Sequence, residues 1–287
     1  MRNFKLTLAY DGSAFKGWQR QPGQRTVQDT IEQAIRRVVR HQVHVFGAGR
    51  TDAGVHAAGQ VANVFTLTTM PAMTAFHAIG ARLPKDCSLI HLAEVPLAFH
   101  ATHSAMSKLY RYRVYNAPGR PVEQLADRLA YHFWHPLDVD AMRAAARHLV
   151  GTYDFSALAS RGNKRIDCVR TVLRTDVYRI GLEVRFDIIG TGFLYNQVRN
   201  MVGTLIEVGR GMWSPDYVRV IRESRDRTLA GPTAPARGLC MQWVRYDLAS
   251  LPPDPPQVAE PAETTRLHSS LEPVMPAGVD MNEEPSG

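Results

Sequence analysis

The chain is organised around residues 47–57, which read Gly-Ala-Gly-Arg-Thr-Asp-Ala-Gly-Val-His-Ala. Residues 43–46 precede this stretch with β-branched and aromatic side chains, so it is expected to follow a strand. Its glycines allow positive φ angles and the close approach of a ligand to the main chain. A polar connection that carries one carboxylate, one guanidinium and one imidazole indicates function rather than core packing.

Several interpretations of this stretch compete. A phosphate-binding loop is disfavoured, because Asp52 stands where a dinucleotide fingerprint needs its third glycine and no Walker sequence is present. A metal site has weak support, since Asp52 and His56 are four residues apart but no third ligand lies near them in sequence. Two interpretations stay open: a lone catalytic carboxylate with Arg50 beside it to bind an anion, or an ordinary turn in which Asp52 caps a backbone N–H.

The charge of the chain is unevenly distributed. The whole sequence has 34 Lys and Arg against 27 Asp and Glu. Residues 251–287 hold seven of the acids and one of the bases, which leaves 33 bases against 20 acids in residues 1–250, a net charge of +13. A basic body of this kind favours a polyanionic partner such as nucleic acid, or is simply a basic, soluble surface.

Hydrophobic periodicity predicts an α+β protein. Strands are expected at residues 3–10, 43–46, 60–67, 107–115, 169–178, 182–189 and 242–246. Helices are expected over residues 72–83 and 196–208. Three more are expected to begin at Thr26, at Asp138 and at Ser214-Pro215. The order suggests two α+β halves, each a mainly antiparallel sheet backed by helices.

The domain boundaries follow from composition. Residues 117–137 are irregular and contain proline, so we divide the chain into an N-terminal lobe, 1–116, and a C-terminal lobe, 117–250. Residues 251–287 contain eight prolines and scattered acids, which predicts a disordered acidic tail. The chain has no secretory signal or membrane-spanning run, and its three cysteines are far apart, so the expected location is cytoplasmic.

Two stretches are candidates for contact with nucleic acid. Residues 15–25 interleave aromatic and cationic side chains, and among these Arg20 and Arg25 are the better RNA candidates. In the strand expected at residues 107–115, period two places Tyr110, Tyr112 and Val114 on one face and Leu109, Arg111, Arg113 and Tyr115 on the other. Lys108 and Arg111 are the further RNA candidates within it.

With these segments identified, the chain resembles a tRNA pseudouridine synthase of the TruA family from about residue 3 to 247. The resemblance depends on six motifs in order, which are Tyr10-Asp11-Gly12 with Gly17-Trp18-Gln19, Thr26-Val27-Gln28, Gly49-Arg50-Thr51-Asp52-Ala53-Gly54-Val55-His56-Ala57, Phe99-His100-Ala101, Lys108-Leu109-Tyr110-Arg111-Tyr112 and Val198-Arg199-Asn200-Met201-Val202-Gly203. Six motifs in the same order are far more specific than any one of them.

The resemblance implies a homodimer of two-lobed α+β subunits whose joined sheet floors a basic cleft. It implies isomerisation of uridines at positions 38, 39 and 40, on the 3′ side of the tRNA anticodon stem-loop, without a cofactor or a metal. By position, Asp52 is the catalytic aspartate, Tyr110 the ring that packs on the target uracil, and Arg50 the residue that takes the vacated base position. Arg199 is the ion-pair partner of Asp52.

One position departs from the family pattern, and two other functions stay open. Members often have Arg after Phe-His-Ala, whereas this chain has Thr102 and then His103. The chain could be a catalytically silent tRNA-binding protein, or a glycosidase that cleaves the N1–C1′ bond outright. A glycosidase usually needs a second carboxylate, and the motif supplies only Asp52.

Overall fold

The computed structural model describes residues 1–122, 128–160 and 167–246, all of which belong to one compact unit, Met1–Pro252. The expected acidic tail therefore lies outside the described residues. In the described part of the chain no helix is long and apolar enough to cross a lipid bilayer.

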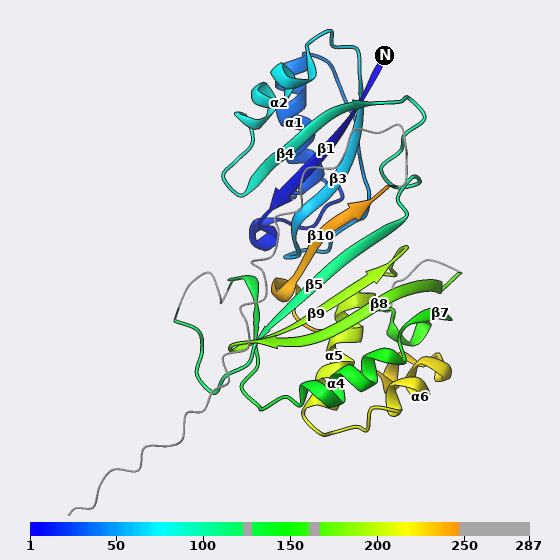
Figure 1. The fold of residues 1–287 in the computed structure, drawn as a ribbon. Helices are drawn as coiled ribbons and strands as arrows, with labels where there is room; N and C mark the ends of the chain where they lie inside the picture. Colours follow the sequence, from blue (N-terminus) through cyan, green and yellow to red (C-terminus); the bar gives the residue numbers. More distant parts are fainter. Residues whose placement is uncertain (123–127, 161–166, 247–287) are drawn as a thin grey trace, which may run out of the picture. The chain divides into compact units, whose positions relative to one another are not determined.

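A single sheet of ten strands forms the centre of this unit (Figure 1). Its main path runs in the order β4-β1-β3-β10-β5-β9-β8-β7, with β2 paired to β3 and β6 paired to β5. The strands are β1 (Arg2–Tyr10), β2 (Val45–Gly47), β3 (His56–Thr66), β4 (Cys87–Val95), β5 (Ser107–Tyr115), β6 (Tyr131–His132), β7 (Gly151–Asp154), β8 (Val169–Ile180), β9 (Glu183–Gly190) and β10 (Leu239–Arg245).

Helices back this sheet in two groups. Helix α1 (Val27–Val39) contacts α2 (Ala72–Gly80), and α2 packs on β4. Helix α4 (Val139–Arg147) packs on β8 and contacts α5 (Gln197–Gly209) and α6 (Tyr217–Ser224). Because all strand pairs except β10 with β3 and β6 with β5 are antiparallel, the predicted α+β class with a mainly antiparallel sheet is confirmed.

Strand β10 joins the two halves of the sheet. It pairs in parallel with β3, where Cys240 lies opposite His56, and antiparallel with β5, where Met241 lies opposite Tyr110. Strand β5 also pairs with β9 over its whole length, from Lys108 opposite Gly190 to Tyr115 opposite Glu183. The last strand in sequence thus brings the loop before β3 next to the tyrosines of β5.

Two local expectations were wrong. The alternating sequence of residues 3–10 predicts a strand with one buried face, but β1 is buried on both: on its second face the Asn3 side chain donates to Phe99 O at 2.9 Å, and Lys5 lies over the Tyr246 ring. Helix α6 does not begin at Ser214-Pro215. The carbonyls of those two residues accept hydrogen bonds from residues 217 and 218, so they form a turn before the helix.

Candidate functional site

The stretch that opened the sequence analysis is the connection between β2 and β3. These two strands pair antiparallel, with Gly47 opposite Ala62, and Ala48 N then donates to Val61 O at 2.7 Å. The chain leaves the sheet after Ala48 and returns at His56, so residues 49–55 form a loop at the edge of a rigid support. We call residues 47–55 the aspartate loop.

The main chain of the aspartate loop is fixed by side chains from elsewhere. Three successive carbonyls each accept one side-chain hydrogen bond: Gly47 O from Thr102 Oγ1 (2.7 Å), Ala48 O from Lys108 Nζ (2.7 Å) and Gly49 O from Gln60 Nε2 (2.8 Å). Thr51 is held twice, since Trp18 N donates to its carbonyl at 2.9 Å and its hydroxyl is 2.8 Å from the Tyr10 hydroxyl. Such support holds a functional side chain in one position.

Two glycines of this loop are needed for physical reasons. A Cβ at Gly47 would lie 2.5 Å from the Trp18 ring, so no larger residue fits while the indole stays in place. Gly54 has φ +79°, in the left-handed region that glycine adopts at little cost. Its N–H donates to Phe15 O at 3.3 Å, and the turn directly after Asp52 is closed by Val55 N, which donates to Asp52 O at 3.1 Å.

Asp52 is the carboxylate that the loop presents. Its side chain is 23% exposed, and its Oδ2 atom lies 3.5 Å from Nη1 of Arg199. Burial raises the pKa of Asp52 above its usual value, and the Arg199 guanidinium offsets part of that rise. Of these two opposing effects on the pKa, burial is the larger.

Helix α5 positions Arg199. Asn196 stands at the N-cap of this helix with φ +59°, and its Oδ1 atom accepts from Arg199 Nη1 at 2.9 Å. Arg199 Nε donates to Ala234 O at 2.7 Å. With two neutral acceptors and one carboxylate around it, the guanidinium is held in one orientation towards Asp52.

Tyr110 lies on β5 beside this pair. Its side chain is buried, and the Phe193 ring contacts it edge-on with ring centroids 5.4 Å apart. Burial raises the pKa of Tyr110 above its ordinary value, with a further contribution from Tyr10 and Asp52. The phenol therefore stays protonated at physiological pH and offers a ring face and an O–H donor rather than a phenolate base.

A cavity of about 1020 Å³ contains all four residues that the sequence singled out as catalytic or supporting. Asp52, Arg50, Tyr110 and Arg199 line it, together with Lys108. Asp52 is the only carboxylate among its described lining residues, whereas Arg50, Lys108 and Arg199 supply three cations. A cavity of this size and charge can take a nucleotide with its phosphate.

Lys108 belongs to the same face of β5 as Tyr110, since the two are two residues apart on a strand. Lys108 Nζ and Tyr110 Oη each lie 3.6 Å from the position that a Cβ on Gly49 would occupy. The strand that carries the tyrosine thus also supplies the cation that holds the aspartate loop at Ala48.

The other sequence candidates lie elsewhere. Arg111 is on the opposite face of β5, where its guanidinium makes a two-point contact with Asp187 at 2.7 and 2.8 Å. Arg20 and Arg25 line a different hollow, described below. His56 does not face Asp52: its Nδ1 atom accepts from Gly12 N at 3.0 Å and lies 3.2 Å from Asp11.

No metal-binding cluster accompanies the loop. Across the residues that the structure describes, no three His, Cys, Asp or Glu side chains are grouped so that they could hold a metal ion. His56, the second residue of the metal interpretation, contacts Gly12 and Asp11 through its Nδ1 atom.

The sequence analysis missed two aromatic residues of the cavity. Phe193 and Tyr195 lie in the short connection between β9 and α5, and both line the cavity. Two large aromatic residues at alternate positions, directly before a helix that carries Arg199, were the available signal. Thr102, which stood out only as a departure from the family pattern, bonds the aspartate loop at Gly47.

We expect Lys108→Met to lower kcat about 10- to 100-fold and the free energy of unfolding by about 1–3 kcal/mol. The substitution removes the side-chain donor from Ala48 O, and a carbonyl that loses its buried partner costs about this much. Single-turnover rates and urea unfolding of the purified protein measure the two effects. The exposed Lys85→Met is the charge-matched control, and equal effects in both variants would contradict the role of Lys108.

Comparison with known proteins agrees with this geometry. A family model described as tRNA pseudouridine synthase matches residues 7–104 and 145–247. The chain is 46% identical to tRNA pseudouridine synthase A of Acetivibrio thermocellus over 246 residues, 45% identical to that of Brevibacillus brevis and 38% identical to that of Clostridium kluyveri. Each alignment covers 86% of this chain and the whole of the relative. With a matching family model over most of its length and relatives well above 30% identity, the chain belongs to the tRNA pseudouridine synthase family, a family of isomerases.

Proposed function

We propose that this protein converts uridine to pseudouridine at positions 38, 39 and 40, on the 3′ side of the tRNA anticodon stem-loop, and that Asp52 is its catalytic residue. The observation that supports the proposal best is the Asp52–Arg199 ion pair beside the buried Tyr110 ring, in a cavity with no second carboxylate among its described lining residues. The three positions follow from the motif resemblance.

The reaction needs one carboxylate and no net change of atoms. The N1–C1′ bond breaks, the uracil turns, and a C5–C1′ bond forms; C5 loses a proton and N1 gains one. An ionised Asp52 can attack C1′, attack C6 or remove the C2′ proton, and each of these three routes needs its charged form. Arg199 supports that form, because it lowers the pKa of Asp52 against the effect of burial.

The target base must leave its stack before it reaches Asp52. Extrusion costs a few kcal/mol, and stacking on an aromatic ring returns about 1–3 kcal/mol. Tyr110 and Phe193 offer ring surface inside the cavity. Arg50 is exposed on the aspartate loop, and we assign it to fill the position in the RNA stack that the extruded base leaves. We assign the protonated Tyr110 hydroxyl to orienting the uracil.

The protein is further proposed to act as a homodimer in the cytoplasm. The cytoplasmic assignment is supported by the cysteines Cys87, Cys168 and Cys240, which are free thiols as a reducing compartment requires. RNA contacts by Arg20, Arg25, Lys108 and Arg111 stay predictions. For Arg111 such a contact competes with its bond to Asp187.

Mapping of pseudouridine tests the function directly. In tRNA from cells that lack the gene, we expect pseudouridine to be absent at positions 38, 39 and 40 and other modified positions to be unchanged. The purified protein should restore the modification to that tRNA and release tritium from 5-labelled uridine. Restoration at other positions alone would contradict the site assignment.

The same assay separates the two alternative functions. A silent tRNA-binding protein would bind the labelled tRNA without releasing tritium. A glycosidase would release free uracil and leave an abasic ribose. The lone carboxylate of the cavity disfavours the second outcome, because glycosidases of the usual type employ two.

A further inference from the structure

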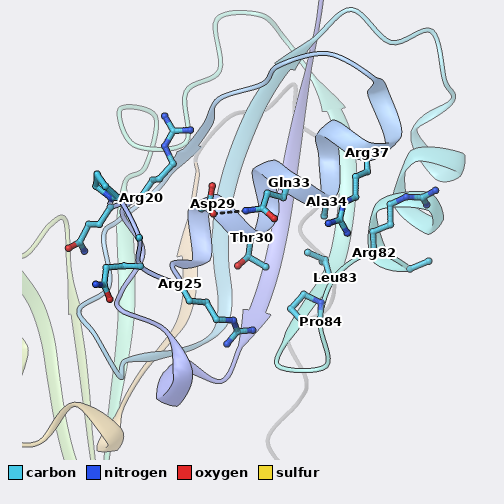
Figure 2. A pocket seen from close by; sticks show the side chains of 15 residues that line it. Arg20, Arg25, Asp29, Thr30, Gln33, Ala34, Arg37, Arg82, Leu83 and Pro84 are labelled. Carbon is cyan, nitrogen blue, oxygen red and sulfur yellow. Dashed lines mark hydrogen bonds between the residues drawn. The ribbon is translucent and has the colours of Figure 1, made fainter.

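A second hollow lies on the helix side of the N-terminal half, between residues 20–25, residues 29–37 of α1 and the turn 81–84 (Figure 2). Its volume is about 980 Å³, and none of its lining residues also lines the catalytic cavity. Four arginines from these three segments line it, namely Arg20, Arg25, Arg37 and Arg82. We call it the arginine groove.

The arginines of this groove differ in how they are engaged. Arg20 is paired with Glu32 at 3.2 Å, and Arg25 with Asp86 at 2.7 Å. Arg37 and Arg82 form no ion pair within the described residues, and both are exposed. Arg82 Nη1 donates to Ala78 O at 2.8 Å, so these two guanidinium groups stand at the groove without a carboxylate partner in the described part of the chain.

The lining offers little negative charge in return. Asp29 is the only carboxylate among the residues that line the groove, and it already accepts a hydrogen bond from Gln33 Nε2 at 2.6 Å. In the view of Figure 2, Leu83 and Pro84 lie between Arg25 on one side and Arg37 and Arg82 on the other. Cations on both sides of a small apolar floor match a sugar–phosphate backbone, in which phosphates alternate with ribose.

The arginine groove and the catalytic cavity adjoin along the chain. Trp18 and Gln19 line the cavity, and the next residue, Arg20, lines the groove. Neighbouring residues of α1 also line different sites: Gln28 lines the cavity and Asp29 lines the groove. The two sites are therefore bounded by the same two segments, residues 18–20 and 28–29.

We propose that the arginine groove binds the sugar–phosphate backbone of the substrate tRNA outside the nucleotide that is modified, with Arg37 and Arg82 as its phosphate contacts. The inference rests on the proposed function for its substrate, and it adds a second binding site to the catalytic one. A small anion is a poorer match, because the guanidinium groups come from three separate segments and do not converge on one point of a groove this large. The site contacts phosphate and ribose only, so it adds affinity without reading sequence.

Salt dependence gives the sharpest test. Each phosphate contact contributes about −0.9 to the slope of log affinity against log salt. The double variant Arg37→Gln, Arg82→Gln should therefore have a slope about 2 units shallower than the unmodified protein. Between 50 and 200 mM salt the unmodified protein should lose about tenfold more affinity for full-length tRNA than the variant does. Fluorescence anisotropy with labelled tRNA measures both slopes.

The control carries the same change of charge. Arg36→Gln with Arg147→Gln removes two exposed arginines on α1 and α4 that do not line the groove. We expect its salt slope to stay near that of the unmodified protein. Turnover at saturating tRNA should be unchanged in the groove variant, since neither Arg37 nor Arg82 lines the catalytic cavity.

Three outcomes would overturn the proposal. The first is a slope equal to that of the control variant. The second is a change in sedimentation mass without RNA, which would make the groove a contact between copies of the chain. The third is a loss of turnover at saturation, which would place these arginines in the chemistry. Failure of the proposed function is distinct, because the unmodified protein would then form no pseudouridine in the tRNA.

Discussion

Asp52→Asn is expected to reduce pseudouridine formation by at least about 10⁴-fold and to leave the tRNA dissociation constant within about threefold. Removal of a group that acts directly on the reacting atoms has effects of this size. The amide cannot serve as a nucleophile or a base, whereas its shape is nearly that of the carboxylate. Arg199 keeps its two neutral acceptors, Ala234 O and Asn196 Oδ1, so the cavity should keep its form.

Single-turnover conversion of 5-labelled tRNA, followed by tritium release, measures the rate, and anisotropy measures the affinity. Asp140→Asn is the matched control: its side chain is 88% exposed and pairs with Arg143 on the surface. That control should behave as the unmodified protein does. Substantial turnover by Asp52→Asn would refute the catalytic assignment, and equal loss in the control would point to a general defect.

Much of this site could be predicted from the sequence because it lies in local patterns. The glycines around Asp52 predicted a loop after a strand, and that loop follows β2. Period two placed Tyr110 on the face of β5 that proves to be buried. Arg199 was assigned as the partner of Asp52 through the motif at residues 198–203, and a charge beside an apolar helix face needs such a partner.

Other features depend on contacts that no local pattern contains. Strand β4 was not predicted, because its register shifts against β1 near Leu8 and its buried positions, Cys87, Leu89, Leu92 and Val95, lose strict alternation. The final strand was predicted, but its place in the middle of the sheet depends on pairing with β3 and β5 across more than a hundred residues. That pairing is what brings the aspartate loop beside Tyr110.

The support of the aspartate loop was invisible for the same reason. The donors at Thr102, Lys108 and Gln60 come from three separate segments and reach three successive carbonyls. Sequence reasoning assigned Lys108 to RNA and noted Thr102 only as a departure from the family pattern. In the structure both have a structural task, since each satisfies a carbonyl of the aspartate loop a few residues before Asp52.

Arg199→Met is expected to lower activity at pH 7 about 10- to 100-fold and to move the acid limb of the rate profile to higher pH. Burial already raises the pKa of Asp52, and Arg199 is the group that holds the pKa down. Without that group the pKa rises further. Activity that needs the ionised carboxylate is present above this pKa and is lost as the pH falls through it, so the loss should begin at a higher pH.

Stability should depend on pH in the direction opposite to activity: the contribution of Asp52 to the free energy of unfolding falls as the pH rises. Folding raises the pKa of such a carboxylate, so its contribution to stability is complete when the pH is below its pKa in the unfolded chain. The contribution is lost as the pH rises through its pKa in the folded protein. In Arg199→Met that loss is larger, so the destabilisation relative to the unmodified protein should grow from pH 4 to pH 8. It should reach no more than about 3 kcal/mol, since Asp52 and Arg199 retain some exposure.

A double variant separates the ion pair from the packing of the Arg199 side chain. Asp52→Asn combined with Arg199→Met has no carboxylate to leave unpaired, so its destabilisation should show little dependence on pH. Arg199→Lys keeps the charge but lacks the planar group that contacts Asn196, Ala234 and Asp52 together, and it should fall between the unmodified protein and Arg199→Met in activity. An acid limb that stays in place in Arg199→Met, with normal stability at pH 8, would show that the pairing does not keep Asp52 ionised.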